Sequence, residues 1–514
     1  MKNFNFQSQK EVLDFLKENK IVKFVRIIFP DVLGREMSFC IPSFGMKSAF
    51  ENGKGFDGSS VESFARIEES DLNIVPDPKT FRVLPWPYEA AGLSWKEAVV
   101  FGDIFTPKGE YFEGDCRYLL KKTLEKTKNF GRLFAGAELE FFLFENENEP
   151  KLLDNGGYFY GGKWGEIRKI SQLYLKEMGI DVEHDHHEVA PSQHEIDIKF
   201  GDALTMADSV ILAKYVIKRV ARKLGLFASF MPKPITKING SGMHLHLSLW
   251  RTPPTHHPPA SRAPKNLFFE KRGDFLSDSA KEYLTGLIKY GREIQILLNQ
   301  WINSYKRLIP GYEAPVYLAW GRKNRSAYIR IPEYQLGEEK STRIELRSPD
   351  PACNIYLALA IIQATGIKGI KDSNPPTTRG ARDKREGGGR VGVPSKGRAP
   401  HLKFPPPEEK DIFEMTEAEM KRKKIRTLSK NLKVSLELFK KSKLAEKTLG
   451  NHIFQKIIQN KEIEWGNYKK AVGKKPSTRA KLGAGPVPHR NKVSGAGFEK
   501  KVSPYEIKEY LPVL

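Results

Sequence analysis

The chain has 514 residues, 39% of them hydrophobic, and 85 basic against 62 acidic side chains give it a net charge of +23. This length and composition allow roughly two to four domains with a sizeable core and exclude a chain that is disordered throughout. The longest mainly apolar stretch, of about 13 residues, falls short of the roughly 20 that span a bilayer, and the N-terminus lacks the apolar run of a signal peptide. Three scattered cysteines, Cys40, Cys116 and Cys353, favour a reducing, cytoplasmic location.

The elements expected along the chain fall into three regions. Residues 1–100 combine an amphipathic helix over Glu11–Asn19 with short apolar strands such as IVKFVRIIF. Residues 101–372 carry most of the alternating strands with helices between them, among them a helix over Met206–Leu224. Residues 405–472 have a helical pattern with long Lys/Glu-rich runs. The sequence shows no internal repeat.

Three segments differ in composition from the rest of the chain: residues 251–266, 375–404 and 473–501. They are basic and rich in proline or in glycine and proline, without a helical or strand period, and we predict disordered surface insertions. Together they carry +16 of the +23 net charge, so the basic composition mainly describes the insertions. They could bind nucleic acid, but their composition favours solvated insertions, and we do not expect nucleic acid as a partner.

Four short segments alternate strictly between apolar and polar residues, as strands with one buried face do. Their polar faces carry, in chain order, Glu138 and Glu140; Glu195 and Asp197; His244, His246 and Ser248; Arg343, Glu345 and Arg347. One such segment is more often a strand with a solvated face, but four with these residue types indicate a shared cavity. Carboxylates gathered there need cations, and carboxylates with an imidazole suit Mg²⁺ or Mn²⁺ better than zinc. The run HDHHE at 184–188 lacks nearby cysteines and the helical zinc spacing.

Arginines supply a second group of candidate site residues. Between positions 307 and 347 the chain has Arg307, Arg325, Arg330, Arg343 and Arg347. Beside metal ions such a cluster suits a phosphorylated, multiply anionic substrate, although a salt-bridged surface gives the same pattern. The sequence has neither a P-loop motif nor a strand-linked G-x-G-x-x-G, so a bound nucleotide would be held in another way.

Seven segments, in order, resemble the signatures of type I glutamine synthetase. They are GFDGSSVESFARIEESD (55–71), GAELEFFLF (136–144), HHEVAPSQHEID (186–197), FMPKP with NGSGMHLHLSL (230–249), NSYKRLIPGYEAP (303–315), NRSAYIRIP (324–332) and RIELRSPDPACNIYLALA (343–360). The resemblance covers essentially all of the chain outside the three insertions.

The resemblance implies an α+β fold with a β-grasp-like N-terminal domain over residues 1–107. A catalytic domain over residues 108–514 would carry a curved antiparallel sheet and helices. The implied activity joins ammonia to L-glutamate through a γ-glutamyl phosphate, with ATP as co-substrate and two or more Mg²⁺ or Mn²⁺ ions per site. The implied assembly is a dodecamer of two hexameric rings, with active sites between subunits and a C-terminal tail docked into the opposite ring.

The matching motif positions imply roles for individual residues. The ligands of one divalent ion would be Glu140, Glu188 and Glu195, and those of the other Glu138, His244 and Glu345. Asp57 matches the residue that binds and helps to deprotonate ammonium, and Glu313 matches a flap carboxylate that completes that site. Catalytic and substrate contacts would come from Arg325, Asn239, Gly240, Arg307, Arg330 and Arg347, with His246 and Ser248 on the nucleotide side.

The short spacing from Glu188 to Glu195 resembles the alpha branch of the family, in which an arginine at the position of Arg66 mediates glutamine feedback. Two alternatives stay open. A glutamate–amine ligase acting on a polyamine or methylamine ranks lower, because such relatives tend to lack the ammonium carboxylates that Asp57 and Glu313 provide. A catalytically silent member that binds nucleic acid through its basic loops is disfavoured by the intact metal carboxylates.

Overall fold

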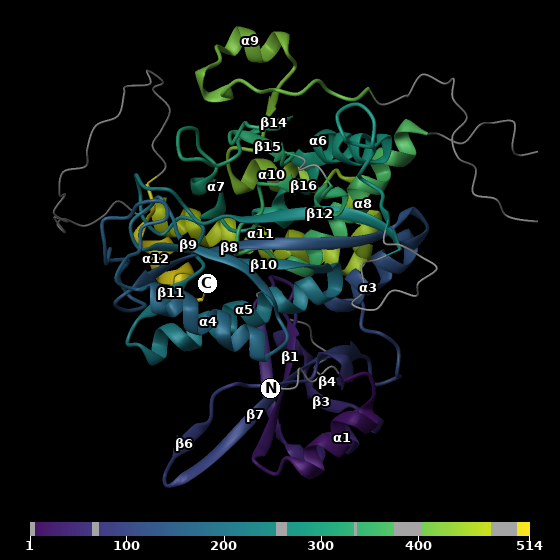
Figure 1. Ribbon diagram of the computed structural model, residues 1–514, viewed down its shortest axis with the longest axis vertical. Helices are drawn as coiled ribbons and strands as arrows, with labels where there is room; N and C mark the ends of the chain where they lie inside the picture. The colour runs from purple at the N-terminus through teal and green to yellow at the C-terminus, as the bar shows by residue number, and fades with distance from the viewer. Residues whose placement is uncertain are drawn as a thin grey trace, which may run out of the picture.

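A computed structural model describes residues 6–63, 71–252, 265–333, 337–374, 403–473 and 501–513. In Figure 1 the N-terminal elements lie below and the larger C-terminal part lies above, with the sheet strands β8, β10 and β12 crossing its middle. Arg66 and most residues of the three expected insertions lie outside the described residues. The first insertion is shorter than expected, because a strand pairing of Thr252 with Lys265 continues the sheet at both of its ends.

The N-terminal part is a seven-stranded sheet with the order β2-β1-β7-β4-β3, to which β5 and β6 add by pairing with β7. Strands β1 and β7 are parallel and the other pairs are antiparallel. The expected first helix is present, and the Ser8 side chain caps it by accepting from the Glu11 N–H. The elements are α1 (Gln9–Glu18), β1 (Val22–Pro30), β2 (Glu36–Pro42), α2 (Met46–Asn52), β3 (Lys54–Asp57), β4 (Asp71–Pro76), β5 (Arg82–Val83), β6 (Tyr88–Ala90) and β7 (Leu93–Phe105).

The C-terminal part is built on a ten-stranded sheet with the order β17-β14-β15-β16-β12-β8-β10-β9, plus β11 on β8 and β13 on β12. The four expected alternating segments are its neighbouring strands β16, β12, β8 and β10, and their apolar side chains are buried. The strands are β8 (Arg132–Phe144), β9 (Val182–His187), β10 (Gln193–Asp202), β11 (Phe227–Ser229), β12 (Met243–Thr252), β13 (Lys265–Asn266), β14 (Tyr317–Gly321), β15 (Ala327–Arg330), β16 (Ile344–Leu346) and β17 (Arg426–Thr427).

One strand pair departs from the expected antiparallel sheet. Strands β14 and β15 run parallel, so the sheet is mixed. In the connection between them, Asn324 Nδ2 donates to the carbonyl oxygens of Glu408 and Lys410. These contacts fix the connection to a segment more than eighty residues further along the chain.

Helices cover the apolar side of the sheet. In Figure 1, α4 and α5 lie beneath β8, β9 and β10. Helix α5 begins at Ala203, three residues before the expected start, because the Asp202 carboxylate accepts from the Thr205 N–H. None of the described helices is long and apolar enough to cross a membrane. The helices are α3 (Cys116–Thr127), α4 (Gly165–Glu177), α5 (Ala203–Lys223), α6 (Asp278–Leu298), α7 (Ser304–Arg307), α8 (Ile355–Ser373), α9 (Glu417–Arg422), α10 (Leu432–Phe439), α11 (Lys443–Gly473) and α12 (Pro504–Tyr510).

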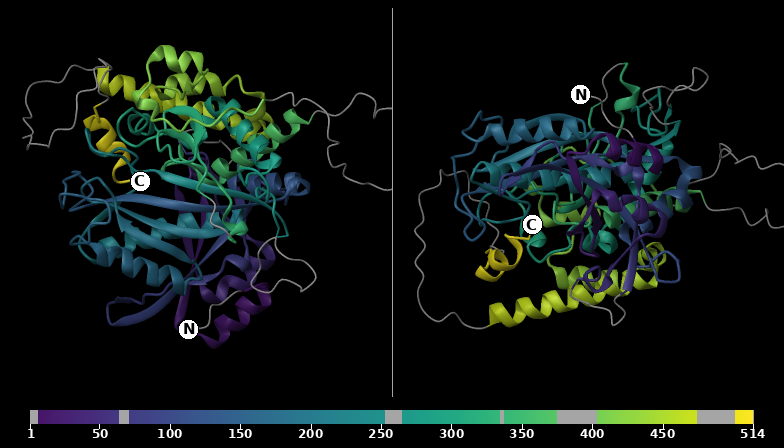
Figure 2. Two further views of the ribbon diagram at one scale, coloured as in Figure 1. Left: turned by 45° about the horizontal axis from the view of Figure 1, so that its top comes forward. Right: turned by 90° about the horizontal axis from the view of Figure 1, so that it is seen from below.

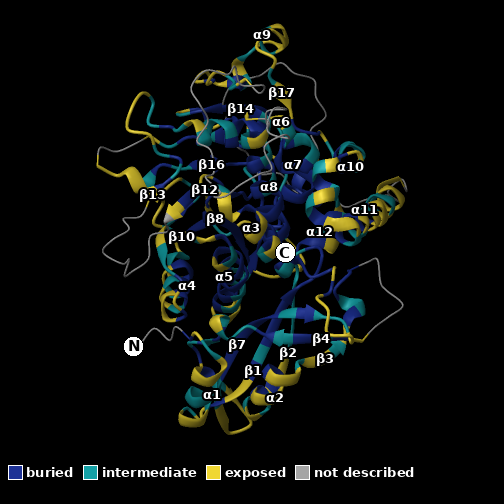
Figure 3. Cartoon of the chain, turned by 90° about the vertical axis from the view of Figure 1, so that its right-hand side faces the viewer, coloured by how far each residue is buried: buried dark blue, intermediate teal, exposed yellow. Residues whose placement is uncertain are grey.

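The two parts share a buried junction, and in Figure 3 dark strands of the N-terminal sheet extend toward the larger part. Asn354 Nδ2 donates to the carbonyl oxygens of Asp31 and Val32, and Gln300 Nε2 donates to that of Ala352 and contacts that of Leu33. These amide groups satisfy N-terminal backbone that folding has removed from water.

The C-terminal tail packs against its own chain. The carboxylate of Glu506 accepts from Asn303 Nδ2 at 3.0 Å, and the Tyr510 hydroxyl donates to Glu464 at 2.8 Å. Leu511 is fully buried. The tail therefore packs against the start of α7 and the long α11, which runs along one side of the molecule in Figure 2. Docking of the tail into an opposite ring stays a prediction.

Candidate active site

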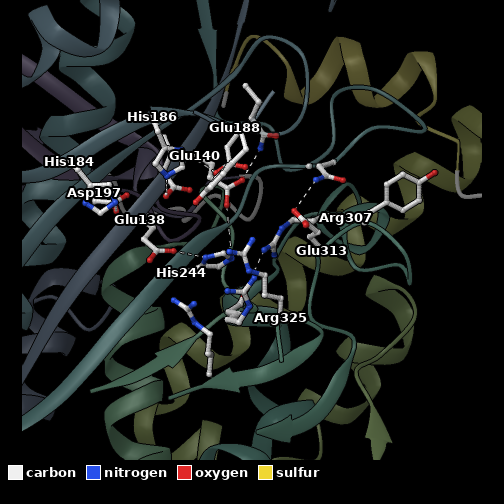
Figure 4. Close-up of a pocket in the computed structure, with 18 of the residues that line it drawn as sticks. Glu138, Glu140, His184, His186, Glu188, Asp197, His244, Arg307, Glu313 and Arg325 are labelled. Atoms are coloured by element: carbon white, nitrogen blue, oxygen red, sulfur yellow. Dashed lines mark hydrogen bonds and ion pairs between the residues drawn. The ribbon is translucent and has the colours of Figure 1, made fainter. Parts of the chain in front are cut away.

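A polar cavity of about 250 Å³ opens where the polar faces of β8, β10, β12 and β16 meet. Figure 4 shows carboxylates and histidines on one side of it, with Arg307, Arg325 and Glu313 opposite. Twelve expected site residues line it: Glu138, Glu140, Glu188, Glu195, Asn239, Gly240, His244, Arg307, Glu313, Arg325, Arg330 and Arg347. Two more, His246 and Glu345, lie directly behind and contact lining residues.

Strand register explains why these side chains meet. Glu138 on β8 lies opposite His244 on β12, and Glu140 on the same strand lies opposite Glu195 on β10. Directly opposed residues of an antiparallel pair project to the same face about 5 Å apart. The period-two pattern of each strand and the pairing between strands therefore place all four groups on one surface.

The Glu345 cluster consists of Glu138, His244 and Glu345, whose potential ligand atoms lie within 4.8 Å of one another. His244 Nδ1 is 2.7 Å from Glu138 Oε2, and His246 Nε2 is 2.6 Å from Glu138 Oε1. Burial alone would raise the pKa of Glu138. The neighbouring His246 and His244 outweigh burial and hold the pKa of Glu138 well below its usual value. Burial and Arg347 lower the pKa of His244, which favours the neutral imidazole that a metal ion needs.

Glu345 itself is fully buried between two arginines. Arg347 Nη1 donates to it at 2.6 Å, and Arg330 Nε donates to its second oxygen. Burial again opposes ionisation, yet Arg347 lowers the pKa of Glu345. Two of the expected substrate-binding arginines thus also neutralise a carboxylate of this cluster.

The Glu195 cluster consists of the three expected ligands Glu140, Glu188 and Glu195. The potential ligand atoms of Glu188 and Glu195 lie within 4.8 Å of each other and of His186, whereas Glu140 is outside this group and lies opposite Glu195 on the neighbouring strand. Burial and the neighbouring Glu188 raise the pKa of Glu140 to about 8. Burial and Glu140 raise the pKa of Glu195, and burial raises that of Glu188. His186, which the sequence did not predict as a site residue, lies 3.1 Å from Glu195 and 3.6 Å from Glu188.

The side chains fit divalent cations. Five carboxylates and one neutral imidazole form a hard donor set of the kind that holds Mg²⁺ or Mn²⁺. The Gly242 position leaves the space between them open, since a Cβ there would lie 2.6 Å from Arg307 Nη2 and 2.9 Å from Glu140 Oε1. Within the described part of the chain, the buried oxygens Asp197 Oδ1 and Gln193 Oε1 have no hydrogen-bond partner. The site therefore has both the ligands and unused acceptors for cations.

The opposite wall carries Arg307 and the Glu313 loop. Arg307 is buried, and its guanidinium donates to the carbonyl oxygens of Ser348 at 2.9 Å and of Arg347 at 3.2 Å. Arg325 is exposed at the mouth of the cavity. Glu313 adopts a left-handed backbone with φ of 53°, a strained conformation for a non-glycine residue, and its carboxylate accepts from Asn239 Nδ2 at 3.3 Å.

Lys233 contacts the Glu313 loop, and it was not predicted from the sequence as a site residue. Its ammonium lies 4.1 Å from the centre of the Tyr312 ring and donates to the Ile238 carbonyl oxygen. Burial and the nearby Arg307 lower the pKa of Lys233 to about 8. One buried cation thus connects the Glu313 loop with the loop that carries Asn239.

Three expected residues are not at this cavity. Asp57 lies at the exposed end of β3 and does not line it. Ser248 is buried outside the lining, where its hydroxyl accepts from Trp250 Nε1 at 2.9 Å. Arg66 lies outside the described residues. The strand period predicted the face of Ser248 correctly, but β12 extends beyond the cavity.

Two family models match the sequence. The glutamine synthetase β-grasp domain matches residues 21–107, and the glutamine synthetase catalytic domain matches residues 113–386 and 392–478. The chain belongs to the glutamine synthetase family. Glutamine synthetase of Methanosarcina mazei is 41% identical over 474 residues, covering 90% of this chain and 96% of its own, and that of Thermotoga maritima is 39% identical over 467 residues, covering 89% and 96%.

Solved structures agree with the family assignment. Plasmodium falciparum glutamine synthetase, determined by cryo-electron microscopy, superposes with a TM-score of 0.72 at 26% identity, covering 91% of this chain and 98% of its own. A GmaS–ADP complex superposes with a TM-score of 0.73 at 26% identity, covering 89% and 96%. These matches confirm the α+β fold with a β-grasp N-terminal domain that the sequence predicted.

Several lining residues of this glutamine synthetase family member were not predicted as site residues. Gln193 and Asp197 belong to the motif around Glu195, and strand alternation placed Asp197 on the polar face. His184 and His186 belong to the HDHHE run, whose alternation along β9 gave the available signal. Tyr158 comes from a loop without periodicity, so no sequence pattern indicated it.

Proposed function

We propose that this chain is a glutamate–ammonia ligase, which converts L-glutamate, ammonium and ATP into L-glutamine through a γ-glutamyl phosphate. The observation that carries the proposal is the meeting of two carboxylate clusters and several arginines in one cavity of a glutamine synthetase fold. Phosphoryl transfer to a carboxylate brings many negative charges together, and this site offers the means to neutralise them.

We assign one divalent ion to the Glu345 cluster and another to the Glu195 cluster, with Mg²⁺ or Mn²⁺ as the metal. When bound, these ions would neutralise phosphate oxygens and orient the reacting groups. The chain itself would hold the substrate's charged groups with Arg307, Arg325, Arg330 and Arg347. Asn239 and Gly240 would position the amino acid, and His246 would face the nucleotide. The ADP complex of the GmaS relative supports a nucleotide site in this fold.

Arg307 is prepared for the role of substrate ligand. Its guanidinium is fixed by backbone carbonyl oxygens, so little side-chain entropy remains to be lost when an anion binds. Its burial also keeps water away, which strengthens the attraction to a carboxylate or phosphate.

We place Glu313 at the ammonium site, where its carboxylate would favour NH₄⁺ over neutral water. Closure of its loop would exclude the water that otherwise hydrolyses an acyl phosphate. Asp57 lies outside the cavity of its own chain, and we assign it to the ammonium site of a neighbouring subunit. Its exposed position at the end of β3 is compatible with that role.

The proposal extends to assembly and regulation. We propose a homo-oligomer of two hexameric rings, a domain boundary at residues 107 and 108, the alpha branch of the family, and glutamine feedback through Arg66. The match of the β-grasp model to residues 21–107 supports the boundary, and the spacing of Glu188 and Glu195 supports the branch. Free thiols at all three cysteines support a cytoplasmic location.

The test is phosphate release from ATP and Mg²⁺ with glutamate, comparing ammonium with methylamine and putrescine. We expect turnover with ammonium, and a loss of about 100-fold or more in Glu313→Ala. Glu333→Ala is the matched control, because Glu333 is 65% exposed and pairs only with the surface residue Lys323 among the described residues. Turnover with amines alone would establish the amine ligase instead, and no turnover by correctly assembled particles would contradict both enzymes.

A further inference from the structure

A second cavity, of about 1160 Å³, lies between α3, α6, α8 and the start of α11, and we call it the lysine groove. Its rim carries three pairs of lysines, one pair on each of three helices: Lys122 and Lys126 on α3, Lys368 and Lys371 on α8, Lys443 and Lys447 on α11. Lys289 and Lys441 add two further cations, whereas the acidic lining residues are only Glu293 and Asp372. The groove therefore has a strong excess of positive charge.

The two acidic residues compensate only one end of the groove. Asp372 accepts from Lys289 and Tyr290 and pairs with Lys368, and these hydrogen bonds outweigh burial and lower its pKa to about 2. Glu293 accepts from the Ser442 hydroxyl at 2.7 Å. Within the described residues, Lys122, Lys126, Lys371, Lys441 and Lys447 have no ion pair.

This arrangement differs from an ordinary solvated helix face. Lysines at i and i+4 repel each other, and surface helices usually offset them with glutamates at the same spacing. Here Glu125 on α3 pairs with Lys128, and Glu446 on α11 pairs with Lys443, so neither neutralises the other rim lysines. The like charges converge on one groove from three helices and are left for an external anion.

The floor of the groove is apolar and restricts the kind of anion. Leu119, Ile367 and Leu449 are buried beneath it, and Leu444 is half-buried at its side. Leu444 still offers apolar surface to the groove, which an amphipathic segment would cover and a free phosphate or a purely acidic chain would leave against water. The chain's own insertions at 375–404 and 473–501 are themselves basic, so their charge does not complement the lysines.

We propose that the lysine groove docks an acidic amphipathic segment of a partner protein, with apolar side chains on the Leu119–Ile367–Leu449 floor and carboxylates against the rim lysines. Long, flexible lysines suit a partner whose carboxylates need no fixed bidentate geometry. Complementary charge would accelerate the encounter and make it sensitive to salt, and the apolar floor would select among acidic partners.

The test uses two labelled helical peptides of equal negative charge and the full-length, assembled protein. One peptide has leucines along one face and glutamates elsewhere, and the second has glutamine in place of each leucine. Fluorescence anisotropy measures their Kd for the wild type, for the groove variant Lys122→Glu/Lys126→Glu/Lys447→Glu, and for the control Lys10→Glu/Lys20→Glu/Lys23→Glu. The control makes the same change in net charge at exposed N-terminal lysines.

We expect the leucine–glutamate peptide to bind the wild type and the control alike, and the groove variant at least about tenfold more weakly. We expect the glutamine-substituted peptide to bind the wild type more weakly by a similar factor. We expect the same loss of affinity when the leucine–glutamate peptide binds the variant Leu444→Asn. The single variant Lys126→Glu tests the groove even if the triple variant misfolds. Glutamine synthesis and Tm show whether the single and the triple variant are folded. Equal binding by groove and control variants would overturn the proposal, as would equally tight binding of tripolyphosphate or single-stranded DNA, which would indicate a general anion site.

Discussion

The two carboxylate clusters of the active site differ in how their charge is balanced before a metal ion binds. In the Glu345 cluster, histidines and arginines contact every carboxylate, and the pKa values of Glu138 and Glu345 are lowered. In the Glu195 cluster, His186 lies beside Glu195 and Glu188, and Glu140 has only His244 at 4.0 Å and the charge of Arg307, so the pKa values of all three carboxylates are raised.

This difference separates two ways of building a metal site. The Glu345 cluster is an ion network that the folded chain completes by itself, so its geometry is fixed in advance. The Glu195 cluster holds buried like charges, which destabilise the fold until a cation joins them. We therefore expect the first cluster to contribute to stability and the second to make stability depend on divalent ions.

The largest expected effect is that of Glu345→Gln. This change leaves Arg330 and the buried Arg347 without their anionic partner, and breaking such a buried pair costs about 3–5 kcal/mol. Glu195→Gln, the matched change in the other cluster, removes one of the mutually repelling carboxylates and should leave the stability equal or higher in EDTA. Urea unfolding in EDTA measures both, and we expect both variants to lose glutamine synthesis.

Equal destabilisation by the two substitutions would contradict the comparison, because it would mean that both clusters are balanced to the same extent. A stable Glu345→Gln variant would mean that the two arginines find other partners.

The second expected effect is the stabilisation of the wild type by Mg²⁺. An ion at 100 times its Kd adds about 2.7 kcal/mol to the free energy of unfolding, and relief of repulsion in the Glu195 cluster is part of this gain. Thermal unfolding with Mg²⁺ and with EDTA measures the difference in Tm. In Glu195→Gln the difference should shrink to less than half, whereas Glu333→Ala should retain all of it.

The sequence predicted those parts of the site that follow from strand alternation and from family motifs. Alternation in β8, β10, β12 and β16 identified which side chains share a face, because one buried face suffices to fix that pattern. It did not predict His186, whose place beside Glu195 depends on the pairing of β9 with β10. It also did not show that Glu345 lies behind Arg330 and Arg347. Strand alternation tells which face of a sheet a side chain is on, but not how deeply it is buried there.

The fold was predictable to a similar extent and for a similar reason. Long periodic helices such as α5 were predicted to within three residues, and the difference came from a capping side chain. The parallel pairing of β14 with β15 was missed, because it depends on a turn anchored by residues more than eighty positions further along the chain.

The smallest expected effect concerns Lys233, which connects the Glu313 loop to the loop that carries Asn239. Its pKa of about 8 means that the cation–π contact with Tyr312 weakens as the pH rises through 8, so kcat/KM for ammonium should fall there by about threefold. The contribution of Lys233 to stability has the opposite sign. Between pH 8 and 10.5 the unfolded chain holds a proton that the folded chain has lost, so this contribution rises with pH.

Lys233→Arg separates the loop contact from the rest of the pH dependence. Arginine keeps its charge throughout this range and can stack on Tyr312, so the variant should lose the step near pH 8. Lys233→Met should show the lowered kcat/KM already at pH 7 and no further step. Profiles of kcat/KM from pH 7 to 9.5 distinguish the three proteins. If Lys233→Arg kept the step near pH 8, the step would arise from the carboxylate clusters instead. The Glu195 cluster would be the first candidate, because the pKa of Glu140 lies in the same range.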